Sequence, residues 1–272
     1  MVLRDKTVAI IGVGNMGLAL MRGIIDSGAV PPERIVIHNK RKERTEALAQ
    51  EYGVRAAESN AACVQGADIV LIAVKPQIFT KVLGEIRGAL GDAVVLSVAA
   101  GITCARIEAE LGGVPRVVRA MPNTPATIKE GATAVCGGAH ATELDVEMAQ
   151  AILQEISEVV VVVDEIHMDA VTGLSGSGPA YIMLIIEAFA DAGVKVGLSR
   201  EIAQALAVQT IRGSARLLQV TNEHPGRLKD QVTSPGGTAI AGLHTLEEGG
   251  LRTTIINAVE AATRRAKELG ES

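Results

Sequence analysis

The hydrophobic residues of the first half of the chain fall into two alternating patterns. Short runs rich in Val, Ile and Leu predict buried strands, and segments in which apolar residues recur every three or four positions predict helices between them. Strands are predicted at 7–11, 34–38, near 54, 68–74, 93–98, 116–119, near 132–136 and at 158–163. The run at 68–74 is uninterrupted, as is typical of a central parallel strand covered on both faces. This alternation predicts an α/β fold with a doubly wound sheet.

Beyond Asp164 only helical patterns remain. We therefore expect one domain at 1–164 and a second, all-α domain at 165–272. The segment 179–193 is apolar nearly all around its helix, and a helix with one exposed side cannot bury such a surface within its own chain. We expect this helix to pack into another subunit, which predicts a homo-oligomer with a helical dimerisation domain.

The first predicted strand runs directly into a Gly-x-Gly-x-x-Gly sequence formed by Gly12, Gly14 and Gly17, and a helical pattern follows at 18–25. Strand, tight turn and helix in this order are the opening of a Rossmann-type dinucleotide-binding fold. Gly12 allows the turn, Gly14 lets the backbone approach a pyrophosphate, and Gly17 lets the helix pack on the strand. The free amides of the helix would hold the phosphates. The alternative is that the glycines serve turn geometry alone.

The end of the second strand indicates which dinucleotide binds. Folds that prefer NAD carry an Asp or Glu about twenty residues beyond the glycines, where it binds the ribose hydroxyls. This chain has Asn39 there, followed by Lys40, Arg41 and Lys42. These cations would attract a 2′-phosphate, so NADP(H) is predicted in preference to NAD(H). The alternative is a solvated, basic start of a helix.

Ligands in open α/β sheets gather at the carboxyl ends of the strands. One predicted strand ends in the sequence Ala73 to Pro76, and the next ends in Ala99 to Gly101, whose small side chains would admit a flat ring. We expect both segments beside the cofactor. Lys75 could act as a general base there or contribute only its backbone. The loop from Met121 to Pro125, fixed by two prolines, would close one side of the substrate.

Two segments of the second half combine Ser, Gly and Pro ahead of an apolar helix, namely 175–179 and 234–238. Each predicts a helix start with unobstructed amide donors, which is an arrangement that binds anions. At the second segment, the amides of Gly237 and Thr238 and the hydroxyls of Ser234 and Thr238 could hold a small carboxylate. The alternative is that both are glycine-rich caps that permit tight helix packing.

Composition narrows the classes of partner. The 272 residues include only two Phe, two Tyr and no Trp, and the net charge is −5, so nucleic acid is not expected to bind. The cysteines Cys63, Cys104 and Cys136 form no Cys-x-x-Cys pair, and we interpret them as small buried hydrophobic residues of a reducing cytosol. The five histidines show no ligand spacing and no Gly-x-Ser-x-Gly elbow occurs, so neither a metal centre nor a hydrolase is predicted.

The location of the protein is predicted from its apolar runs. The first six residues carry charges where a secretory signal would need an apolar run. The longest apolar run, 179–190, is too short to span a bilayer and contains Glu187. We therefore expect a soluble, cytoplasmic protein with no membrane partner.

Six segments, taken in order, resemble the pyrroline-5-carboxylate reductase family over nearly the whole chain, from residue 6 to about 265. They are 12–17, 73–77 (AVKPQ), 97–101 (SVAAG), 119–125 (RAMPNTP), 173–181 (GLSGSGPAY) and 230–238 (DQVTSPGGT). Each segment alone is weak evidence for the resemblance, but all six in this order are highly specific for the family. The resemblance implies reduction of 1-pyrroline-5-carboxylate to L-proline by hydride transfer from NAD(P)H, the final step of proline biosynthesis. It also implies a helical domain that interlocks two subunits, with dimers often assembled into larger rings such as a decamer.

The residue patterns and the resemblance together predict the site. The predicted cofactor-binding residues are Gly12, Gly14, Asn15, Met16, Gly17, Asn39, Lys40, Arg41, Asn60, Ala73, Val74, Lys75, Pro76, Ala99, Ala100 and Gly101. The predicted substrate-binding residues are Met121, Pro122, Ser175, Ser234, Gly236, Gly237, Thr238 and Ala239. The resemblance alone implies Asn60, and it implies that the ligand with the proline ring meets the segment 234–239.

One departure from the family concerns the proton donor. The family usually carries a threonine at the position of Ala239, and its hydroxyl is assigned to the ring nitrogen; here the threonine lies one place earlier, at Thr238. Asn222 likewise stands where some relatives place a glutamate. Thr238 and Ser234 are the predicted catalytic residues. Because a cyclic imine protonated on nitrogen is already a strong electrophile, positioning is the main task of the site.

Two other functions are compatible with the sequence. A β-hydroxyacid dehydrogenase-like enzyme would use Lys75 or another lysine to take a hydroxyl proton, and a lysine in the first long helix of the second domain would favour it; the stretch 175–190 contains none. A non-catalytic NADP-binding module would bind the cofactor without turnover, whereas the second anion site argues for a substrate.

Overall fold

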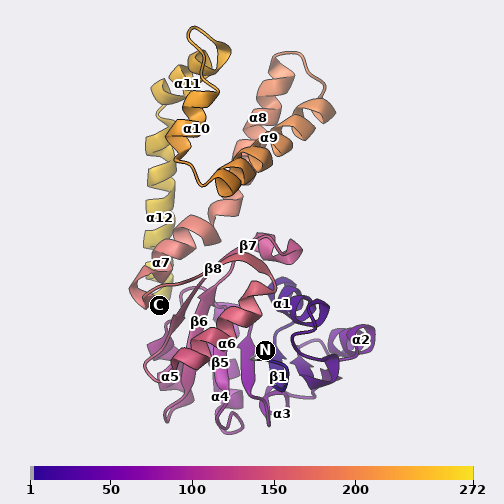
Figure 1. Cartoon of the computed structure of the whole chain (residues 1–272). Helices are drawn as coiled ribbons and strands as arrows, with labels where there is room; N and C mark the ends of the chain where they lie inside the picture. The colour runs from indigo at the N-terminus through magenta and orange to yellow at the C-terminus, as the bar shows by residue number, and fades with distance from the viewer. Residues whose placement is uncertain (1–2, 272) are drawn as a thin grey trace. The chain divides into compact units, whose positions relative to one another are not determined.

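The computed structural model describes residues 3–271, which form two compact units. The first unit runs to Ser177 and includes the chain from Ala261 onwards, and the second comprises Gly178–Glu260 (Figure 1). The predicted domain boundary at 164/165 lies within the first unit, close to the start of the helical part of the chain, and stays a prediction.

The first unit is built on one eight-stranded sheet with the order β3-β2-β1-β4-β5-β6-β7-β8. Its strands are β1 (Val8–Ile11), β2 (Ile35–His38), β3 (Arg55–Ala56), β4 (Ile69–Ile72), β5 (Val94–Ser97), β6 (Arg116–Met121), β7 (Gly131–Gly137) and β8 (Ser157–Val162). The strands β1 to β6 are parallel, whereas β7 is antiparallel to β6 and parallel to β8. The strand order reverses between β1 and β4, as in a Rossmann-type sheet. The predicted fold class is confirmed.

Helices connect the strands of the first unit, and side-chain caps fix where several of them begin. The helices are α1 (Asn15–Asp26), α2 (Lys42–Tyr52), α3 (Asn60–Val64), α4 (Pro76–Ile86), α5 (Cys104–Leu111), α6 (Glu143–Gln154) and α7 (Met168–Val171). Shorter turns are η1 (Pro32–Arg34), η2 (Thr124–Ile128), η3 (Glu165–His167) and the π-helical η4 (Thr172–Gly176). Ser59 and Thr103 accept hydrogen bonds from the third amides of α3 and α5, and Thr142 forms a capping box with Asp145.

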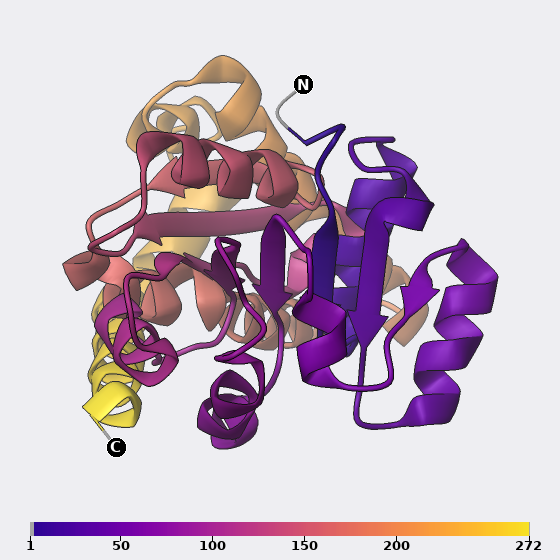
Figure 2. The ribbon, with the colours of Figure 1, turned by 90° about the horizontal axis from the view of Figure 1, so that it is seen from below.

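The sheet is covered on both faces because its strands are apolar in consecutive positions. In β1, Val8 and Ile10 pack in one core cluster with α1 and α6, while Ala9 and Ile11 pack in the other with α4 and α5. The same alternation holds along β4, where all residues are buried. Figure 2 shows α6 on one side of the sheet and α4 and α5 on the other. In open α/β sheets covered in this way, ligands bind at the carboxyl ends of the strands.

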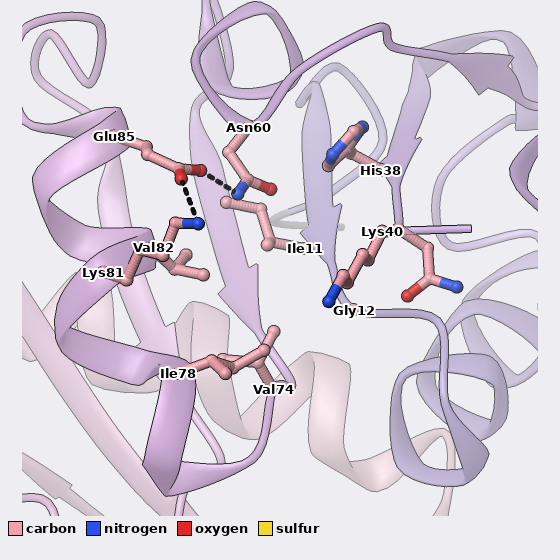
Figure 3. Close-up of a pocket in the computed structure, with 11 residues that line it drawn as sticks. Ile11, Gly12, His38, Lys40, Asn60, Val74, Ile78, Lys81, Val82 and Glu85 are labelled. Atoms are coloured by element: carbon pink, nitrogen blue, oxygen red, sulfur yellow. Dashed lines mark hydrogen bonds and ion pairs between the residues drawn. The ribbon is translucent and has the colours of Figure 1, made fainter. Parts of the chain in front are cut away.

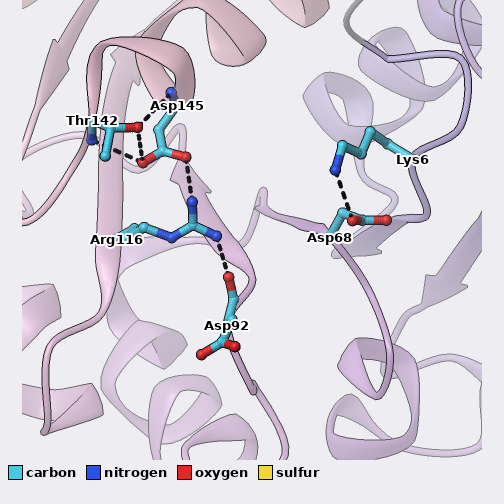
Figure 4. Close-up of polar contacts among 6 residues, drawn as sticks. All are labelled: Lys6, Asp68, Asp92, Arg116, Thr142 and Asp145. Carbon is cyan, nitrogen blue, oxygen red and sulfur yellow. Dashed lines mark hydrogen bonds and ion pairs between the residues drawn. The ribbon is translucent and has the colours of Figure 1, made fainter.

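Two polar clusters hold the edge of the sheet at which the parallel strands begin (Figure 4). Lys6 and the amide of Thr7 donate to the carboxylate of Asp68, at 3.0 and 2.8 Å, and so fix the segment that precedes β1 beside the one that precedes β4. Arg116, at the start of β6, donates to the fully buried carboxylate of Asp145 at 2.8 Å and to the backbone carbonyl of Asp92. These contacts align the strands from the end opposite to the glycine turn.

The second unit consists of helices. They are α8 (Gly178–Lys195), α9 (Arg200–Thr221), α10 (Pro225–Gln231), α11 (Thr238–Glu248) and the first part of α12 (Leu251–Glu271). Helices α8 and α9 pack against each other, yet large apolar side chains such as Met183, Leu184 and Leu206 are 56–66% exposed. A helical domain that leaves this much apolar surface uncovered has the property expected of a subunit of a larger assembly.

Among the described residues, one helical segment, 165–195, is long and apolar enough in length and composition to cross a membrane. It extends the apolar run 179–190, which by itself is too short. Only 11% of its most apolar window is buried in the single chain. The core helix of a soluble protein can pass the same test of length and composition, so one such helix is weak evidence for a membrane span.

Candidate active site

The glycine turn has the steric features that a close approach to a ligand requires. Gly12 has φ +92°, and a Cβ there would lie 2.7 Å from the carbonyl oxygen of Ala73. A Cβ on Gly17 would lie 2.0 Å from the carbonyl oxygen of Gly12, so helix α1 can pack on the turn only through a glycine. A Cβ on Gly14 would meet nothing within 4 Å. Gly14 therefore faces open space, which is the property expected of the glycine that a pyrophosphate approaches.

The start of α1 leaves its first amides available. Gly14 is the N-cap and no side chain caps it, so the amides of Asn15, Met16 and Gly17 have no partner within the helix. Arg44, from α2, donates through Nε to the carbonyl oxygen of Val13 at 3.1 Å. The turn thus combines free amide donors with a nearby guanidinium, and both favour an anion.

A cavity of about 330 Å³ opens beside the turn, between the ends of β1, β2 and β4 and one face of α4 (Figure 3). Its lining includes residues from the predicted cofactor set, namely Gly12, Asn39, Lys40, Asn60 and Val74. It also includes residues that the sequence did not single out, namely Ile11, His38, Ile78, Lys81, Val82 and Glu85. The cavity therefore brings five of the predicted cofactor residues together around one space.

Asn60 is held in place on one side of this cavity. Its Nδ2 donates to the Glu85 carboxylate at 2.6 Å, and Lys81 lies 3.8 Å from the same carboxylate (Figure 3). The Oδ1 of Asn60 is buried and has no hydrogen-bond partner within the described part of the chain. Because buried acceptors are normally paired, this oxygen is an acceptor available to a donor group of a ligand.

Basic side chains surround a second cavity of about 520 Å³ on the other side of the turn. Its lining comprises Val13, Gly14, Asn15, Asn39, Lys40, Arg41 and Arg44. The predicted residues Asn39, Lys40 and Arg41 thus lie together, and Arg44 joins them because helix α2 folds back towards the turn. No carboxylate lines this cavity among the described residues, so its charge favours a phosphate.

The segments after β4 and β5 differ in how far they are exposed. Lys75 is exposed and precedes α4, with Pro76 as the first residue of that helix. Whether Lys75 acts through its side chain or its backbone alone stays a prediction. Ala99 is buried, Ala100 is partly buried, and Gly101 has φ +73° with a Cβ position 3.4 Å from the backbone of Gly270 at the end of α12.

The loop after β6 is fixed by Asn123. Its Nδ2 donates to the carbonyl oxygen of Ser175 at 3.2 Å, and its Oδ1 accepts from the amide of Ala132 at 3.0 Å. Met121 lies close to the same segment, since a Cβ on Gly176 would be 2.6 Å from its Cε. The structure thereby brings together the predicted substrate residues Met121, Pro122 and Ser175 within the first unit.

The segment 175–179 contains the start of a helix, as the sequence predicted, although the chain before it is helical too. The π-helical η4 ends at Gly176, the amide of Ser177 donates to the carbonyl oxygen of Thr172 at 2.8 Å, and α8 begins at Gly178. Pro179 stands in the first turn of α8, where its missing N–H costs no hydrogen bond within the helix. The amide of Ser177 is therefore taken up by η4, and an anion site at this helix start stays a prediction.

The segment 234–239, in the second unit, does form a helix start. Gly237 is the N-cap of α11 and no side chain caps it, so the amides of Thr238 and Ala239 lack partners within the helix. The amide of Gly237 itself donates to the carbonyl oxygen of Ser234 at 3.0 Å. This amide was predicted to be free and is not. Ser234 and Thr238 are exposed, as a site for a small anion requires.

Several residues of these sites were not predicted from the sequence, because their placement depends on tertiary structure. Arg44 and Glu85 belong to amphipathic helices whose polar residues look alike in the sequence, although the i, i+4 spacing of Lys81 and Glu85 marks one shared face. The three cysteines are buried as interpreted, but Cys104 and Cys136 lie together with Glu165. Spacing along the chain gave no sign of this cluster.

The chain is similar to known proteins over nearly its whole length. A family model described as pyrroline-5-carboxylate reductase dimerisation matches residues 165–269, and one described as NADP oxidoreductase coenzyme F420-dependent matches residues 7–101. A pyrroline-5-carboxylate reductase of Arabidopsis thaliana is 44% identical over 97% of this chain and 96% of its own length. The enzyme of that name from Escherichia coli (strain K12) is 41% identical over 98% of this chain and 100% of its own.

Solved structures agree with these relatives. A pyrroline-5-carboxylate reductase from Coxiella burnetii superimposes with a TM-score of 0.93 at 36% identity and covers 99% of this chain and 100% of its own. A pyrroline carboxylate reductase from Plasmodium falciparum with NADP bound superimposes with a TM-score of 0.88 at 33% identity, covering 98% and 99%. A ketol-acid reductoisomerase at 17% identity and a TM-score of 0.68 shares the fold alone.

Proposed function

The chain belongs to the pyrroline-5-carboxylate reductase family, and from this premise we propose that it reduces 1-pyrroline-5-carboxylate to L-proline with a hydride from NADPH. The observation that carries the proposal is that two kinds of anion site occur in one chain. One is a glycine turn with free amides and basic neighbours, and the other is the exposed start of α11 at Gly237. The first suits a dinucleotide phosphate, and the second suits a small carboxylate.

The described residues fit NADP(H). Open space at Gly14 admits the pyrophosphate, and the amides at the start of α1 donate to it. Lys40, Arg41 and Arg44 supply the charge that a 2′-phosphate needs, and the unpaired Oδ1 of Asn60 accepts from the adenosine half. When bound, NADPH supplies the hydride. We infer a preference for NADP(H), with NAD(H) as the weaker cofactor.

The substrate carboxylate is assigned to the start of α11. The amides of Thr238 and Ala239 and the hydroxyl of Ser234 donate to it, and the Thr238 hydroxyl stands one residue before the position at which the family carries its threonine. Met121, Pro122 and Ser175 are proposed to enclose the ring. The reaction requires the imine carbon to meet the reduced nicotinamide, which Ala99, Ala100 and Gly101 would seat.

The chemical role of these residues is mainly to position the reactants. The imine nitrogen carries a proton in the reactive form of the substrate, so the site needs no buried acid to activate it. Holding the ring in a pose close to that of hydride transfer removes part of the entropic barrier. The lysine-dependent alternative of a β-hydroxyacid dehydrogenase is disfavoured because the relatives that match nearly the whole chain are pyrroline-5-carboxylate reductases. A binding module without turnover would leave the exposed amides of α11 without a role.

The finer properties of the assembly belong to the same proposal. The match of residues 165–269 to a dimerisation model and the exposed apolar residues of α8 and α9 support a homo-oligomer in which a second copy covers this surface. We propose a dimer as the basic unit, a decamer built from such dimers as the larger assembly, and a cytoplasmic location. We also propose domains at 1–164 and 165–272, since the dimerisation match begins at 165.

The proposal is tested by following the loss of NADPH absorbance with the purified chain. We expect turnover with 1-pyrroline-5-carboxylate, a lower kcat/KM with NADH than with NADPH, and formation of proline. β-Hydroxyacids with NADP⁺ serve as the competing substrates. Turnover of a hydroxyacid without turnover of the imine would contradict the proposal, and so would NADPH binding without oxidation.

A further inference from the structure

A pair of thiols that the proposed reaction does not use lies in the interior of the first unit. Cys104 is the first residue of α5, three residues after Gly101, and Cys136 lies on β7. The two Sγ atoms and a carboxylate oxygen of Glu165 lie within 4.8 Å of one another. Both cysteines are almost completely buried, at 1% and 2% exposure. The fold therefore holds two thiols side by side that are 32 positions apart in the sequence.

The surroundings of the pair make its two sulfurs unequal. Cys136 is the strand partner of Arg119, whose guanidinium is 4% exposed and lies 3.2 Å from Glu165 and 3.9 Å from Asp169. The hydrogen bond from the Cys104 thiol lowers the pKa of Cys136, and the charge of Arg119 lowers it further, although burial and Glu165 oppose this. Donating that bond, together with burial, raises the pKa of Cys104.

The cluster is a poorer site for a metal ion than for chemistry between the two sulfurs. The Oε1 of Glu165 already accepts from the amide of Cys104 at 2.7 Å and from Arg119 at 3.2 Å. A divalent cation bound to this carboxylate would lie against the guanidinium. Within the described residues the cluster offers three ligands, whereas structural zinc sites are closed by four.

We propose that Cys104 and Cys136 are a redox modification site, at which a peroxide small enough to enter the interior converts the two thiols into an intrachain disulfide. The Cys136 thiolate attacks one peroxide oxygen, so that an S–O bond forms, the O–O bond breaks and hydroxide leaves. The Cys104 thiol gives its proton to that hydroxide, and its sulfur then attacks the Cys136 sulfur. The S–S bond forms, the S–O bond breaks, and the departing hydroxyl leaves as water after it takes up a proton. One peroxide is reduced to two waters while two thiols are oxidised.

Cys63 is an internal control for the effect of burial. It is 0% exposed, and its thiol points at the backbone carbonyl oxygens of Val36 and Ile10, at 3.5 and 3.9 Å. Burial raises the pKa of Cys63 to about 12. It is as inaccessible as the pair, and the charge of Arg55 lowers its pKa only slightly against burial, but no second thiol lies beside it in this cluster. Cys63 therefore tests whether a buried thiol without a partner thiol reacts as fast as the pair.

The experiment treats the folded, full-length protein with hydrogen peroxide, blocks the remaining thiols with an alkylating reagent, and digests the chain without reduction. We expect a peptide that joins Cys104 to Cys136, which dithiothreitol separates, and consumption of these two thiols about 10-fold faster than that of Cys63. In Cys104→Ser, Cys136 should stop at a sulfenic acid that a dimedone probe traps, and Cys63→Ser should still form the cross-link.

Three results would overturn the inference. One is oxidation of Cys63 without formation of the cross-linked peptide. Hydrogen peroxide would then have reached the interior of the protein without joining Cys104 to Cys136. Another is equal consumption of the three thiols in the wild-type protein. The third is zinc that copurifies in equal molar amount and whose removal by a chelator is needed before either thiol reacts. The readout is covalent, so it does not depend on the proposed reductase activity.

Discussion

The three glycines of the turn separate two roles that look identical in the sequence. A methyl group on Gly17 would lie 2.0 Å from a backbone oxygen, whereas one on Gly14 would meet nothing within 4 Å. Gly17→Ala is therefore expected to lower the melting temperature or prevent folding. Gly14→Ala should keep the melting temperature and weaken NADPH binding by about 10-fold or more, since a lost contact of 1.4 kcal/mol corresponds to that factor.

The measurement for this pair is calorimetry for stability and fluorescence titration for the dissociation constant of NADPH. If Gly14→Ala bound NADPH as tightly as the wild type, the pyrophosphate would lie elsewhere. If Gly17→Ala folded with unchanged stability, the packing of α1 on the turn would be misdescribed.

Ser234 is the residue by which the substrate assignment is best tested. A replacement of Gly237 would be ambiguous, because a Cβ there would lie 2.2 Å from the Ser234 Oγ and disturb the helix start itself. Ser234→Ala removes only a hydroxyl. We expect the KM for the imine to rise about 10- to 100-fold, as for loss of a hydrogen bond to a charged group, with the KM for NADPH unchanged.

Ser214→Ala is the matched control, since Ser214 is an exposed serine of the second unit whose hydroxyl donates to the carbonyl oxygen of Thr210 within α9. Steady-state kinetics with each substrate varied in turn would measure both constants. An equal rise in both KM values for Ser234→Ala would contradict the assignment of the carboxylate to this helix start.

At the scale of single residues, the sequence predicted those features that local chemistry determines. The glycine turn and the helix start at Gly237 were found because their residue types constrain the backbone nearby. Glu85 and Arg44 were missed because only the folding of α4 and α2 onto the sheet brings them to the cavities. The helix start expected at 175–179 is present at Gly178, whereas the π-helical turn before it, which takes up the amide of Ser177, was not predicted because it leaves no periodic signal in the sequence.

At the scale of the elements, strands were predicted best where both faces are buried. The apolar run that contains β4 leaves little choice of structure, and all four residues of this strand are buried. The short β3 was predicted near residue 54, but the antiparallel direction of β7 was not specified, because strand direction depends on how the connections cross the sheet. The contact between Lys6, Thr7 and Asp68 is an example of such a long-range constraint.

Asp68 gives a prediction about stability and pH. Although burial acts to raise its pKa, the hydrogen bonds from the amide of Thr7 and from Lys6 hold the pKa of Asp68 below its ordinary value. A lowered pKa in the folded state stabilises the fold above the pKa of the unfolded state, about 3.9, and this stabilisation is lost as the pH falls through the folded value. Asp68→Asn should therefore cost about 1 kcal/mol at neutral pH and progressively less at acidic pH.

Urea unfolding of the wild type and Asp68→Asn across a pH series would check this. Asp92→Asn is the control, since Asp92 is exposed and accepts from Arg116 through its backbone carbonyl rather than its carboxylate. A stability difference for Asp68→Asn that stays constant down to low pH would show that the ionised carboxylate is not what holds β4 beside the start of β1.

At the scale of the whole molecule, the sequence predicted a second, helical part and its need for a partner, because 179–193 is apolar on all sides. The exposed apolar side chains of α8 and α9 agree with that reasoning. The division by contacts at Ser177 differs from the predicted boundary at 164/165 because η3, α7 and η4 pack with the sheet unit. Contacts of this kind leave no periodic signal in the sequence.

The assembly is tested by a charge on the exposed apolar surface. Leu184 is 66% exposed in the single chain, so Leu184→Glu should fold normally but raise the dimer dissociation constant at least about 30-fold, as expected when an apolar interface residue is replaced by a charge. Val114→Glu, at a 71% exposed position of the first unit, is the control and should not change association. Sedimentation velocity would report both.

A wild-type chain that sediments as a monomer at micromolar concentration would contradict the proposed dimer. Unchanged association of Leu184→Glu would instead place the interface on another surface of the helices.

We propose that this chain transfers a hydride from NADPH to the imine carbon of 1-pyrroline-5-carboxylate. The most direct measurement uses NADPH deuterated at C4 of the nicotinamide, with each of its two faces labelled in turn, and mass spectrometry of the product. We expect proline that carries one deuterium at C5 from one label and none from the other. Unlabelled proline from both labels, or an imine left unchanged while NADPH is bound, would contradict it.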